Sequence, residues 1–458
     1  MIRLFNVYYP TRTLVLLLCQ AFLVGASFTV ATASILGLDN GYIELMYENG
    51  LAKIAAITLL TLLFSYYFDL YEPQRISARW EAYFRLLLVL SALSFVLAGL
   101  IFFFPQIDIG HNVLAVGVFL LTILLLIWRR IDEWIVGFPL FRQRVYVLGN
   151  GIRAKHVAEV VRARRDAGMQ IIGWQERNDQ GEPGTDLATA LRTFCTTKPE
   201  IDRVIVAMEE RRGCMPIREL LELRVRGVVI EDAGSLYERL LGRLPLDGLT
   251  PSALIFSDGF KIRTSKQMVR RLVSFLVALA VLLICLPAMP FLALAVRLSS
   301  PGPVFFSQTR VGLRGRPFTI YKFRTMRRDA ESKGATWAAK NDPRITRVGT
   351  IMRKTRLDEV PQLWNVLRGD MGFVGPRPER PEFVQWLSRE IPYYDLRHMI
   401  RPGLTGWAQV RYHYGSSLEE TRRKLEYDLY YLKHLSLGLD LLILFETVKT
   451  IVLGRGAQ

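Results

Sequence analysis

The sequence has few cysteines and few acidic residues for its length. Its 458 residues include only four cysteines (Cys19, Cys195, Cys214 and Cys285) and no CxxC pair, so neither a disulfide framework nor a zinc site is indicated. The 42 Asp and Glu are outnumbered by 59 Lys and Arg, and the net charge is +17. No helix-turn-helix, zinc finger or RNA-binding aromatic motif accompanies this charge, so we expect no nucleic-acid partner.

The positive charge is concentrated in one part of the chain. Residues 261–350 hold 17 Lys and Arg against three acids, Asp329, Glu331 and Asp342. Such a block suits an anionic membrane surface or a phosphorylated substrate. We therefore expect membrane lipids and a phosphate-bearing ligand as partners.

Long apolar runs are abundant. The hydrophobic fraction of 51% and the mean hydropathy of +0.21 exceed those of an ordinary soluble enzyme. A membrane helix needs about 20 apolar residues, and four runs of roughly that length occupy 11–37, 52–70, 84–104 and 112–136. The fold class that we expect is a membrane protein, α plus α/β, in which residues 1–140 form a bundle of four transmembrane helices.

Charges between these runs predict the orientation of the helices. Arginines follow the second and fourth runs, whereas the other two connections are acidic or neutral. By the positive-inside rule, the N-terminus and everything after the fourth run are cytoplasmic. The first run lacks the short apolar region and cleavage site of a signal peptide, so it should remain as a helix. The arginines are Arg75, Arg79, Arg85, Arg129, Arg130, Arg142 and Arg144, and the acids are Asp39, Glu44, Glu48 and Asp108.

Residues 141–255 are expected to form a Rossmann-like parallel α/β domain. The stretch RVYVLGNGIRAKHVAEVVRARRDAGMQIIGW reads as a strand, a glycine turn, a helix and a second strand, and further strand patterns occur at 202–208 and 227–232. Gly149, Gly151 and Ala154 fit a nucleotide-binding glycine loop, but the same glycines suit a tight turn that binds nothing. A dehydratase or epimerase would also need a Tyr-x-x-x-Lys pair, and none of the 18 tyrosines has a lysine four residues later.

A fifth apolar run at 272–296 differs from the others because both of its flanks are basic. Pro287 and Pro290 lie near its middle, where proline breaks a helix. Both facts favour a re-entrant hairpin at about 268–298, with a kinked span as the alternative that would place all later residues outside. The flanking cations are Lys261, Arg263, Lys266, Arg270 and Arg271 before the run, and Arg297, Arg310, Arg314, Arg316, Lys322 and Arg324 after it.

The stretch LDEVPQLWNVLRGDMGFVGPRPE, residues 357–379, places Asp358 beside Glu359 just before Pro361. Proline is tolerated in a first helical turn, where acids also serve as caps. Successive helical residues point about 100° apart, so the two acids can serve different partners. One would attack a phosphorus atom while the other holds Mg²⁺, which prefers carboxylates together with phosphate oxygens.

Cations surround this acid pair in the sequence. Lys322 and Arg324 share one face of an expected strand at 318–325. The alternative interpretation is a basic strand that faces solvent or lipid and binds no substrate. Guanidinium groups bind phosphate oxygens at two points, and glycines at 372 and 375 permit close approach of the backbone. The candidate guanidinium groups are Arg353, Arg377 in GPRP, and Arg401 in RPGLTGWAQV.

These motifs resemble the bacterial sugar transferase family, the monotopic polyprenyl-phosphate phosphoglycosyl transferases. They are SPGPVFFSQTRVG, YKFRTM, LDEVPQLWNVLRGDMGFVGPRPE and IRPGLTGWAQV, and we place the catalytic domain at 256–458. The front and middle regions resemble the long-form members that initiate exopolysaccharide or O-antigen synthesis. The opening MIRLFNVYYPTRTL resembles members associated with exosortase-linked clusters. Many relatives have Ser-Pro at the hairpin break, whereas this sequence has Leu286-Pro287.

The resemblance implies transfer of a phospho-sugar from a UDP-sugar to undecaprenyl phosphate, with release of UMP. Asp358 would be the nucleophile that forms a covalent intermediate, and Glu359 would bind Mg²⁺. Lys322, Arg353, Arg377 and Arg401 would be active-site cations, to which we add Arg324 because it shares the face of Lys322.

The resemblance further implies a bacterial inner-membrane protein with its catalytic domain on the cytoplasmic face, and a homodimer. The tail LSLGLDLLILFETVKTIVLGRGAQ would be an interfacial helix, although a buried core helix has the same spacing. Two rival functions are a membrane-tethered dehydratase or epimerase and a nucleotide-sensing membrane scaffold. No residue identifies the sugar.

Overall fold

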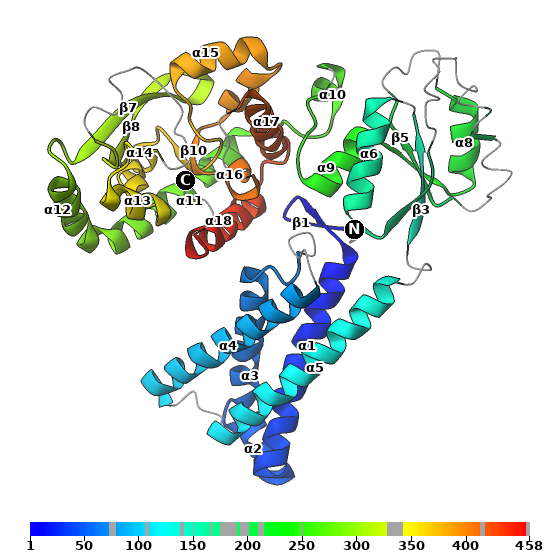
Figure 1. Cartoon of the computed structure of the whole chain (residues 1–458), viewed down its shortest axis with the longest axis vertical. Coiled ribbons are helices and arrows are strands. Elements are labelled where there is room, and N and C mark those ends of the chain that lie inside the picture. Colours follow the sequence, from blue (N-terminus) through cyan, green and yellow to red (C-terminus); the bar gives the residue numbers. More distant parts are fainter. Residues whose placement is uncertain are drawn as a thin grey trace. The chain divides into compact units, whose positions relative to one another are not determined.

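The computed structural model describes most of the chain (Figure 1). The described residues are 1–72, 79–105, 110–137, 142–149, 151–164, 167–174, 189, 191–192, 201–208, 215–247, 249, 251–327, 342–412 and 417–454. Six residues named above lie outside them: Arg75, Asp108, Cys195, Cys214, Asp329 and Glu331. The chain divides into two compact units, Met1–Ile2 with Tyr8–Ala233, and Arg3–Val7 with Gly234–Gln458.

Apolar helices make up the first part of the first unit. They are α1 (Thr11–Leu36), α2 (Leu38–Tyr47), α3 (Gly50–Tyr67), α4 (Arg79–Phe103) and α5 (His111–Gly137). The four apolar runs are confirmed as helices, whereas α2, which follows a sharp turn at Gly37 (φ 82°), was not predicted. Among the described residues, five helices are long and apolar enough to cross a membrane: four here, and Thr264–Ser299. The protein is therefore a membrane protein.

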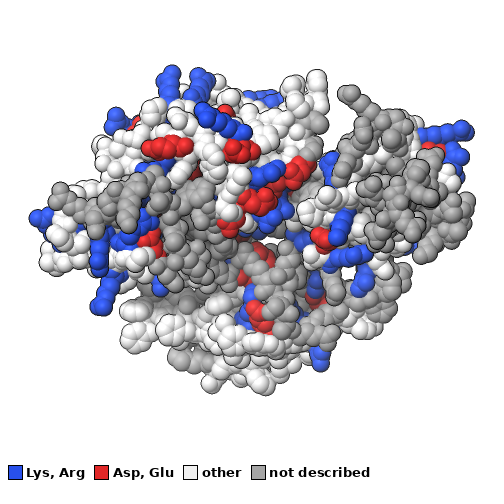
Figure 2. Space-filling model, turned by 45° about the horizontal axis from the view of Figure 1, so that its top comes forward, with Lys and Arg blue, Asp and Glu red and all other residues white. Residues whose placement is uncertain are grey.

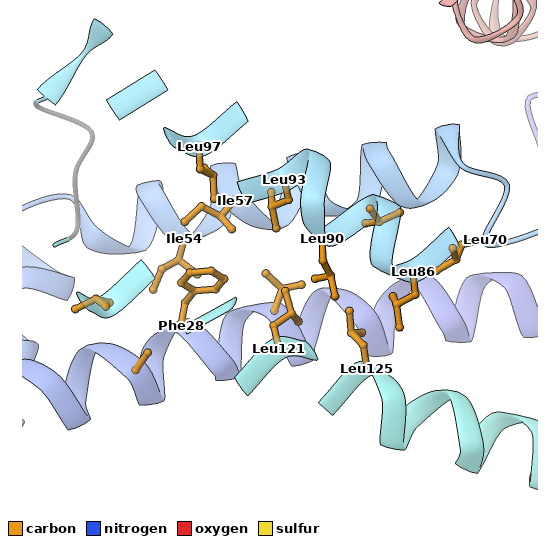
Figure 3. Close-up of a cluster of buried hydrophobic side chains, with 14 residues drawn as sticks. Phe28, Ile54, Ile57, Leu70, Leu86, Leu90, Leu93, Leu97, Leu121 and Leu125 are labelled. Carbon is orange, nitrogen blue, oxygen red and sulfur yellow. The ribbon is translucent and has the colours of Figure 1, made fainter. Parts of the chain in front are cut away.

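The membrane helices share a core of interdigitating aliphatic side chains (Figure 3). Phe28 of α1 lies among Ile54 of α3, Leu93 of α4 and Leu121 of α5, and all of them are buried. Gly117 makes room for the Phe28 ring, since a Cβ there would lie 2.6 Å from two ring carbons. The opposite faces of these helices expose large apolar side chains such as Phe22, Phe95 and Phe119, as expected of helices that contact lipid.

A four-stranded parallel sheet follows, as predicted. It consists of β3 (Gln143–Leu148), β4 (Met169–Trp174), β5 (Arg203–Val206) and β6 (Val229–Asp232) in the order β4-β3-β5-β6. Helices α6 (Ile152–Ala163) and α8 (Ile217–Val225) accompany the strands. Branched residues dominate the core, which includes Leu148, Val204 and Leu220, because the strands of a parallel sheet are covered on both faces.

Packing explains the first glycine of the predicted nucleotide loop. Gly149 has φ 146°, and a Cβ there would lie 2.7 Å from the carbonyl oxygen of Ala207. The indole N–H of Trp174 donates to the Gly149 carbonyl oxygen at 3.2 Å. This close packing is enough to explain why residue 149 is glycine. Nucleotide binding by Gly149 and Gly151 stays a prediction.

The second unit contains the predicted catalytic domain, residues 256–458, together with residues 3–7 and 234–255, and the predicted domain bounds stay predictions. Residues 234–255 carry most of α9 (Ala233–Leu241) and all of α10 (Pro251–Phe256). Arg243 forms an ion pair with Glu426 at 2.9 Å, and the Trp407 indole N–H donates to the Gly242 carbonyl oxygen at 2.8 Å. These contacts join positions 183 and 165 residues apart, so no local sequence pattern indicates them.

The fifth apolar run is broken, as its prolines predict. Helix α11 (Thr264–Cys285) ends at a 3-10 turn, η5 (Leu286–Ala288), and α12 (Met289–Ser299) follows. Pro287 lies in the turn, whereas Pro290 is in the first turn of α12, where its missing N–H leaves no bond unmade. Ala278 of α11 and Val296 of α12 are both buried in the core that contains Ile320, Met352 and Leu363.

Short elements complete the second unit around that core. An antiparallel pair, β7 (Phe305–Val311) and β8 (Pro317–Phe323), precedes a small parallel pair, β9 (Gly372–Val374) and β10 (Gly403–Thr405). The helices are α13 (Arg347–Lys354), η7 (Leu357–Glu359), α14 (Gln362–Arg368), α15 (Pro381–Glu390), η8 (Tyr394–Met399), α16 (Trp407–Arg411), α17 (Leu418–Lys433) and α18 (Leu437–Val452).

Lys and Arg side chains spread over the face shown in Figure 2, with Asp and Glu lying among them.

Candidate active site

The acid pair lies in the 3-10 turn η7, between α13 and α14. Arg356 before it has φ 58° and turns the chain sharply. Pro361 is the N-cap residue of α14, so the acids occupy a separate turn just before this helix rather than its first turn. The exposed fractions of Asp358 and Glu359 are only 7% and 6%. Two buried like charges need cations nearby.

Three cations neutralise Glu359. Its Oε1 accepts hydrogen bonds from Lys322 Nζ at 3.3 Å and from Arg377 Nη2 at 2.9 Å. Its Oε2 accepts one from Arg356 Nη1 at 3.3 Å. Burial alone would raise the pKa of Glu359, but the charges of Arg377, Lys322 and Arg356 hold that pKa far below its usual value. Glu359 therefore stays negatively charged at physiological pH.

Asp358 has a different environment from its neighbour. It is buried, and within the described part of the chain its carboxylate accepts no hydrogen bond and forms no ion pair. Burial and then the charge of Glu359 raise the pKa of Asp358, while Lys322, Arg353 and Arg377 oppose that rise. Asp358 thus lies in the field of three cations without being bonded to any of them. Its oxygens are available for a new bond.

Lys322 and Arg353 approach the acid pair from different elements. Lys322 comes from β8; burial lowers its pKa, and the charges of Glu359 and Asp358 only partly offset this. Arg353 is in the last turn of α13 and donates from Nε to Thr325 Oγ1 at 3.0 Å. The structure therefore brings Lys322, Arg353 and Arg377 together around the pair, as the sequence predicts.

Arg324 and Arg401 have their hydrogen bonds elsewhere. Arg324 donates to the carbonyl oxygens of Pro301 at 3.1 Å and Ser300 at 2.6 Å, and so secures the chain where it leaves α12. Strand β8 ends at Phe323, so the alternation that placed Arg324 beside Lys322 no longer applies. Arg401 donates to the Gly369 carbonyl oxygen at 3.2 Å, at the end of α14 that is remote from the acids. Their roles in substrate binding stay predictions.

Two glycines hold the GPRP turn against the loop that begins with Arg401. A Cβ on Gly403 would lie 2.0 Å from the backbone nitrogen of Gly375, and a Cβ on Gly375 would lie 2.5 Å from the Arg401 carbonyl oxygen. The backbones bond to each other through Gly375 N to Thr405 O and Gly403 N to Pro376 O, both at 2.9 Å. This junction fixes the turn from which Arg377 reaches Glu359.

A buried ion pair that was not predicted from the sequence supports the same turn. Arg397 Nη2 donates to the carbonyl oxygen of Arg377 at 3.0 Å and lies 2.9 Å from a carboxylate oxygen of Asp428. Arg397 Nη1 also donates to the Tyr394 hydroxyl at 2.6 Å. The pair is separated by 31 positions, so nothing local in the sequence indicates it. Arg356 was also missed, although it stands only two residues before Asp358.

The donor set at the acid pair fits Mg²⁺ shared with a phosphate. Magnesium prefers a few carboxylates together with waters and phosphate oxygens. Asp358 has two oxygens without a protein partner among the described residues, and Glu359 remains ionised. The described part of the chain contains no group of three or more His, Cys, Asp and Glu side chains that would enclose a metal by themselves. Glu359 would therefore hold the ion only in company with substrate oxygens, while the oxygens of Asp358 stay available to attack phosphorus.

Comparisons with known proteins indicate the family to which the chain belongs. Residues 265–454 match the family described as bacterial sugar transferase. A UDP-N-acetylgalactosamine-undecaprenyl-phosphate N-acetylgalactosaminephosphotransferase of Aeromonas hydrophila is 45% identical over 221 residues, which cover 48% of this chain and 52% of the relative.

Two other relatives match over a longer part of the chain. A UDP-glucose:undecaprenyl-phosphate glucose-1-phosphate transferase of Escherichia coli is 32% identical over 69% of each chain. An undecaprenyl-phosphate glucose phosphotransferase of Komagataeibacter xylinus is 30% identical over 73% of this chain and 64% of the relative. The chain thus spans about half to two thirds of the length of these relatives. On this evidence, the chain belongs to the bacterial sugar transferase family.

Proposed function

We propose that the protein transfers a sugar phosphate from a UDP-sugar to undecaprenyl phosphate and releases UMP, as the first membrane step of exopolysaccharide or O-antigen synthesis. The observation that carries the proposal is the pairing of a buried, unbonded Asp358 with a Glu359 held by three cations. The names of the relatives, which act on undecaprenyl phosphate, support the same reaction class.

The chemistry follows from the two environments of the acids. A carboxylate oxygen of Asp358 attacks the phosphorus that carries the sugar, and the bond from that phosphorus to UMP breaks. The sugar phosphate is then bound to Asp358 as an acyl phosphate. An oxygen of undecaprenyl phosphate attacks the same phosphorus and expels the Asp358 carboxylate. One phosphoanhydride replaces another, so no further energy source is required.

The cations make this attack feasible. Two anions must approach each other in the first step, and their repulsion falls when positive charge surrounds the phosphate. Lys322, Arg353 and Arg377 already act on Asp358. When bound, Mg²⁺ would neutralise phosphate charge beside Glu359 and orient the substrate. Arg377 and Lys322 would then hold the Glu359 carboxylate in place.

The broken helix α11–η5–α12 would enter the membrane and return to the same side. Both arms contribute to the core on which the acid pair is built, through Ala278 and Val296. The region between them exposes apolar side chains such as Ile284 and Phe291. A straight helix of 36 residues, Thr264–Ser299, would span about 54 Å, and the turn at η5 lets both arms pack against one small core. A re-entrant hairpin places the active site at the depth of the lipid phosphate.

Three further features belong to this proposal. The basic flanks of the membrane helices support a bacterial inner-membrane location with the catalytic unit on the cytoplasmic face. Helix α18 buries Leu439 and Ile443 but exposes Leu441 and Val448, so one face packs in the core and the other suits contact with membrane lipids. The resemblance to long-form transferases supports a homodimer, which light scattering in detergent would test.

The decisive experiment measures UMP release from a panel of UDP-sugars by the full chain with undecaprenyl phosphate and Mg²⁺. Wild type and Asp247→Asn, a change at an exposed acid, should release UMP from the same sugar. Asp358→Asn should be slower by at least about 1000-fold. Without undecaprenyl phosphate, intact mass spectrometry should detect one sugar phosphate on wild type and none on Asp358→Asn. Equal activity of Asp358→Asn would refute the covalent route.

A further inference from the structure

A second group of positive charges lies at the base of α11, near the end of α14 that is remote from the acid pair. A Cβ placed on Gly369 would lie 3.0 Å from Nη2 of Arg271, so the Arg271 guanidinium reaches this residue. Arg401 donates from Nε to the Gly369 carbonyl oxygen at 3.2 Å. Two guanidinium groups, brought from positions 130 residues apart, therefore converge on one glycine.

Arg270, which precedes Arg271, fixes the rotation of α11 about its axis. Arg270 forms an ion pair with Asp440 at 2.6 Å and also bonds to the Tyr431 hydroxyl. Successive helical residues point about 100° apart, so this clamp on α17 and α18 holds Arg271 toward Gly369. Ser274 lies one turn further along, with its hydroxyl 3.9 Å from where a Cβ on Gly372 would be.

Neither guanidinium group has a carboxylate partner in the described part of the chain. The adjacent acid, Asp370, instead lies 3.7 Å from Arg368 Nε and 3.5 Å from Asn365 Nδ2. Burial and the charge of Arg271 both lower the pKa of Arg401, which reflects an uncompensated pair of like charges. Arg401 uses only Nε in its bond to Gly369, so its two terminal nitrogens remain to bind an anion.

We infer that Arg271 and Arg401 together bind the phosphate of an anionic membrane lipid. Arg271 directly precedes the apolar run that begins at Leu272, which places it at the depth of lipid headgroups. Planar guanidinium forks bind phosphate oxygens at two points each. The whole of α14 separates this site from Asp358. We therefore expect this site to hold a lipid phosphate at a distance from Asp358 and to fill without a UDP-sugar.

The test measures lipid binding to the full chain in phosphatidylcholine nanodiscs by native mass spectrometry, without UDP-sugar. One arm titrates phosphatidylglycerol and the other titrates undecaprenyl phosphate. Both lipids carry a phosphate, but the first is a bulk phospholipid and the second is a polyprenyl lipid. Arg271→Gln and Arg401→Gln should each weaken binding at least about tenfold. The double variant should be little weaker than either single one, because both arginines hold the same phosphate. Arg271→Lys, which keeps the charge, should retain part of the affinity.

The matched control is Lys266→Gln, an exposed cation on the same helix that has no contact with Gly369. It removes the same charge and should leave binding unchanged. Tight binding in the phosphatidylglycerol arm would assign the site to bulk phospholipid, and tight binding only in the other arm would assign it to the polyprenyl lipid. Equal losses in Lys266→Gln and Arg271→Gln, or strictly additive losses in the double variant, would overturn the inference in favour of general surface charge. UMP release by the Arg271→Gln protein, measured separately, reports on the transferase proposal.

Discussion

Nη2 of Arg377 lies 2.9 Å from Oε1 of Glu359, and this bond joins the GPRP turn to the acid pair. Lys322 donates to the same oxygen, whereas Arg356 donates to the other one. The carboxylate is therefore oriented from three sides before any substrate arrives. Such pre-organisation is what a residue needs if it is to hold a metal beside a reacting phosphate.

Replacement of Arg377 by Gln should lower the apparent affinity of the enzyme for Mg²⁺. The variant removes the cation nearest to Glu359, and partners that orient a metal ligand typically contribute 10–100-fold in metal affinity or activity, so we expect a change of about that size. UMP release measured against Mg²⁺ concentration gives the apparent affinity. Arg380→Gln, which changes another arginine three residues away, is the control. An unchanged Mg²⁺ dependence in Arg377→Gln would contradict the role given to Glu359.

Removal of Arg397 alone should be more harmful than removal of its whole ion pair. Arg397→Met leaves Asp428 buried without a partner, which typically costs about 3–5 kcal/mol in the free energy of unfolding. The double variant Arg397→Met with Asp428→Leu should recover much of that stability. It should not recover activity, because the Arg377 carbonyl oxygen still lacks its donor. Thermal unfolding and UMP release, measured on the same three proteins, separate the two effects.

Sequence-based expectations and the structure agree best for features that depend on short sequence motifs. Apolar length predicts the membrane helices, and two prolines predict the break at Leu286–Ala288. The acid pair and Lys322, Arg353 and Arg377 are found because motifs of charged and glycine residues indicate phosphate chemistry. The Arg397–Asp428 pair was not predictable, since its partners meet only through tertiary packing of α17 on η8. Arg324 shows the opposite error, in which strand alternation was extended beyond the last strand residue, Phe323.

Gly403→Ala should disrupt the junction that carries the GPRP turn. The added Cβ would lie 2.0 Å from the Gly375 nitrogen and 2.5 Å from the Thr405 carbonyl oxygen, so the two loops must separate. We expect a loss of about 2–4 kcal/mol in the free energy of unfolding, or failure to fold. Gly99→Ala in α4, where nothing lies within 4 Å of the added Cβ, should be neutral or stabilising. Equal melting temperatures of Gly403→Ala and wild type would show that the loops adjust freely.

The stability of the catalytic unit should fall as the solution becomes acidic, and His398 should account for part of this fall. Burial, followed by the adjacent charge of Arg397, lowers the pKa of His398 to about 4. An unfolded histidine has a pKa near 6.5, so the folded state resists protonation. The stabilisation is complete above about pH 6.5 and is lost progressively as the pH falls toward 4, by up to roughly 3 kcal/mol. Urea unfolding at pH 7.5 and at pH 4.5 should show this difference in wild type. In His398→Gln the difference should shrink, because glutamine does not titrate, and a loss of the same size in both proteins would assign the acid sensitivity to other groups.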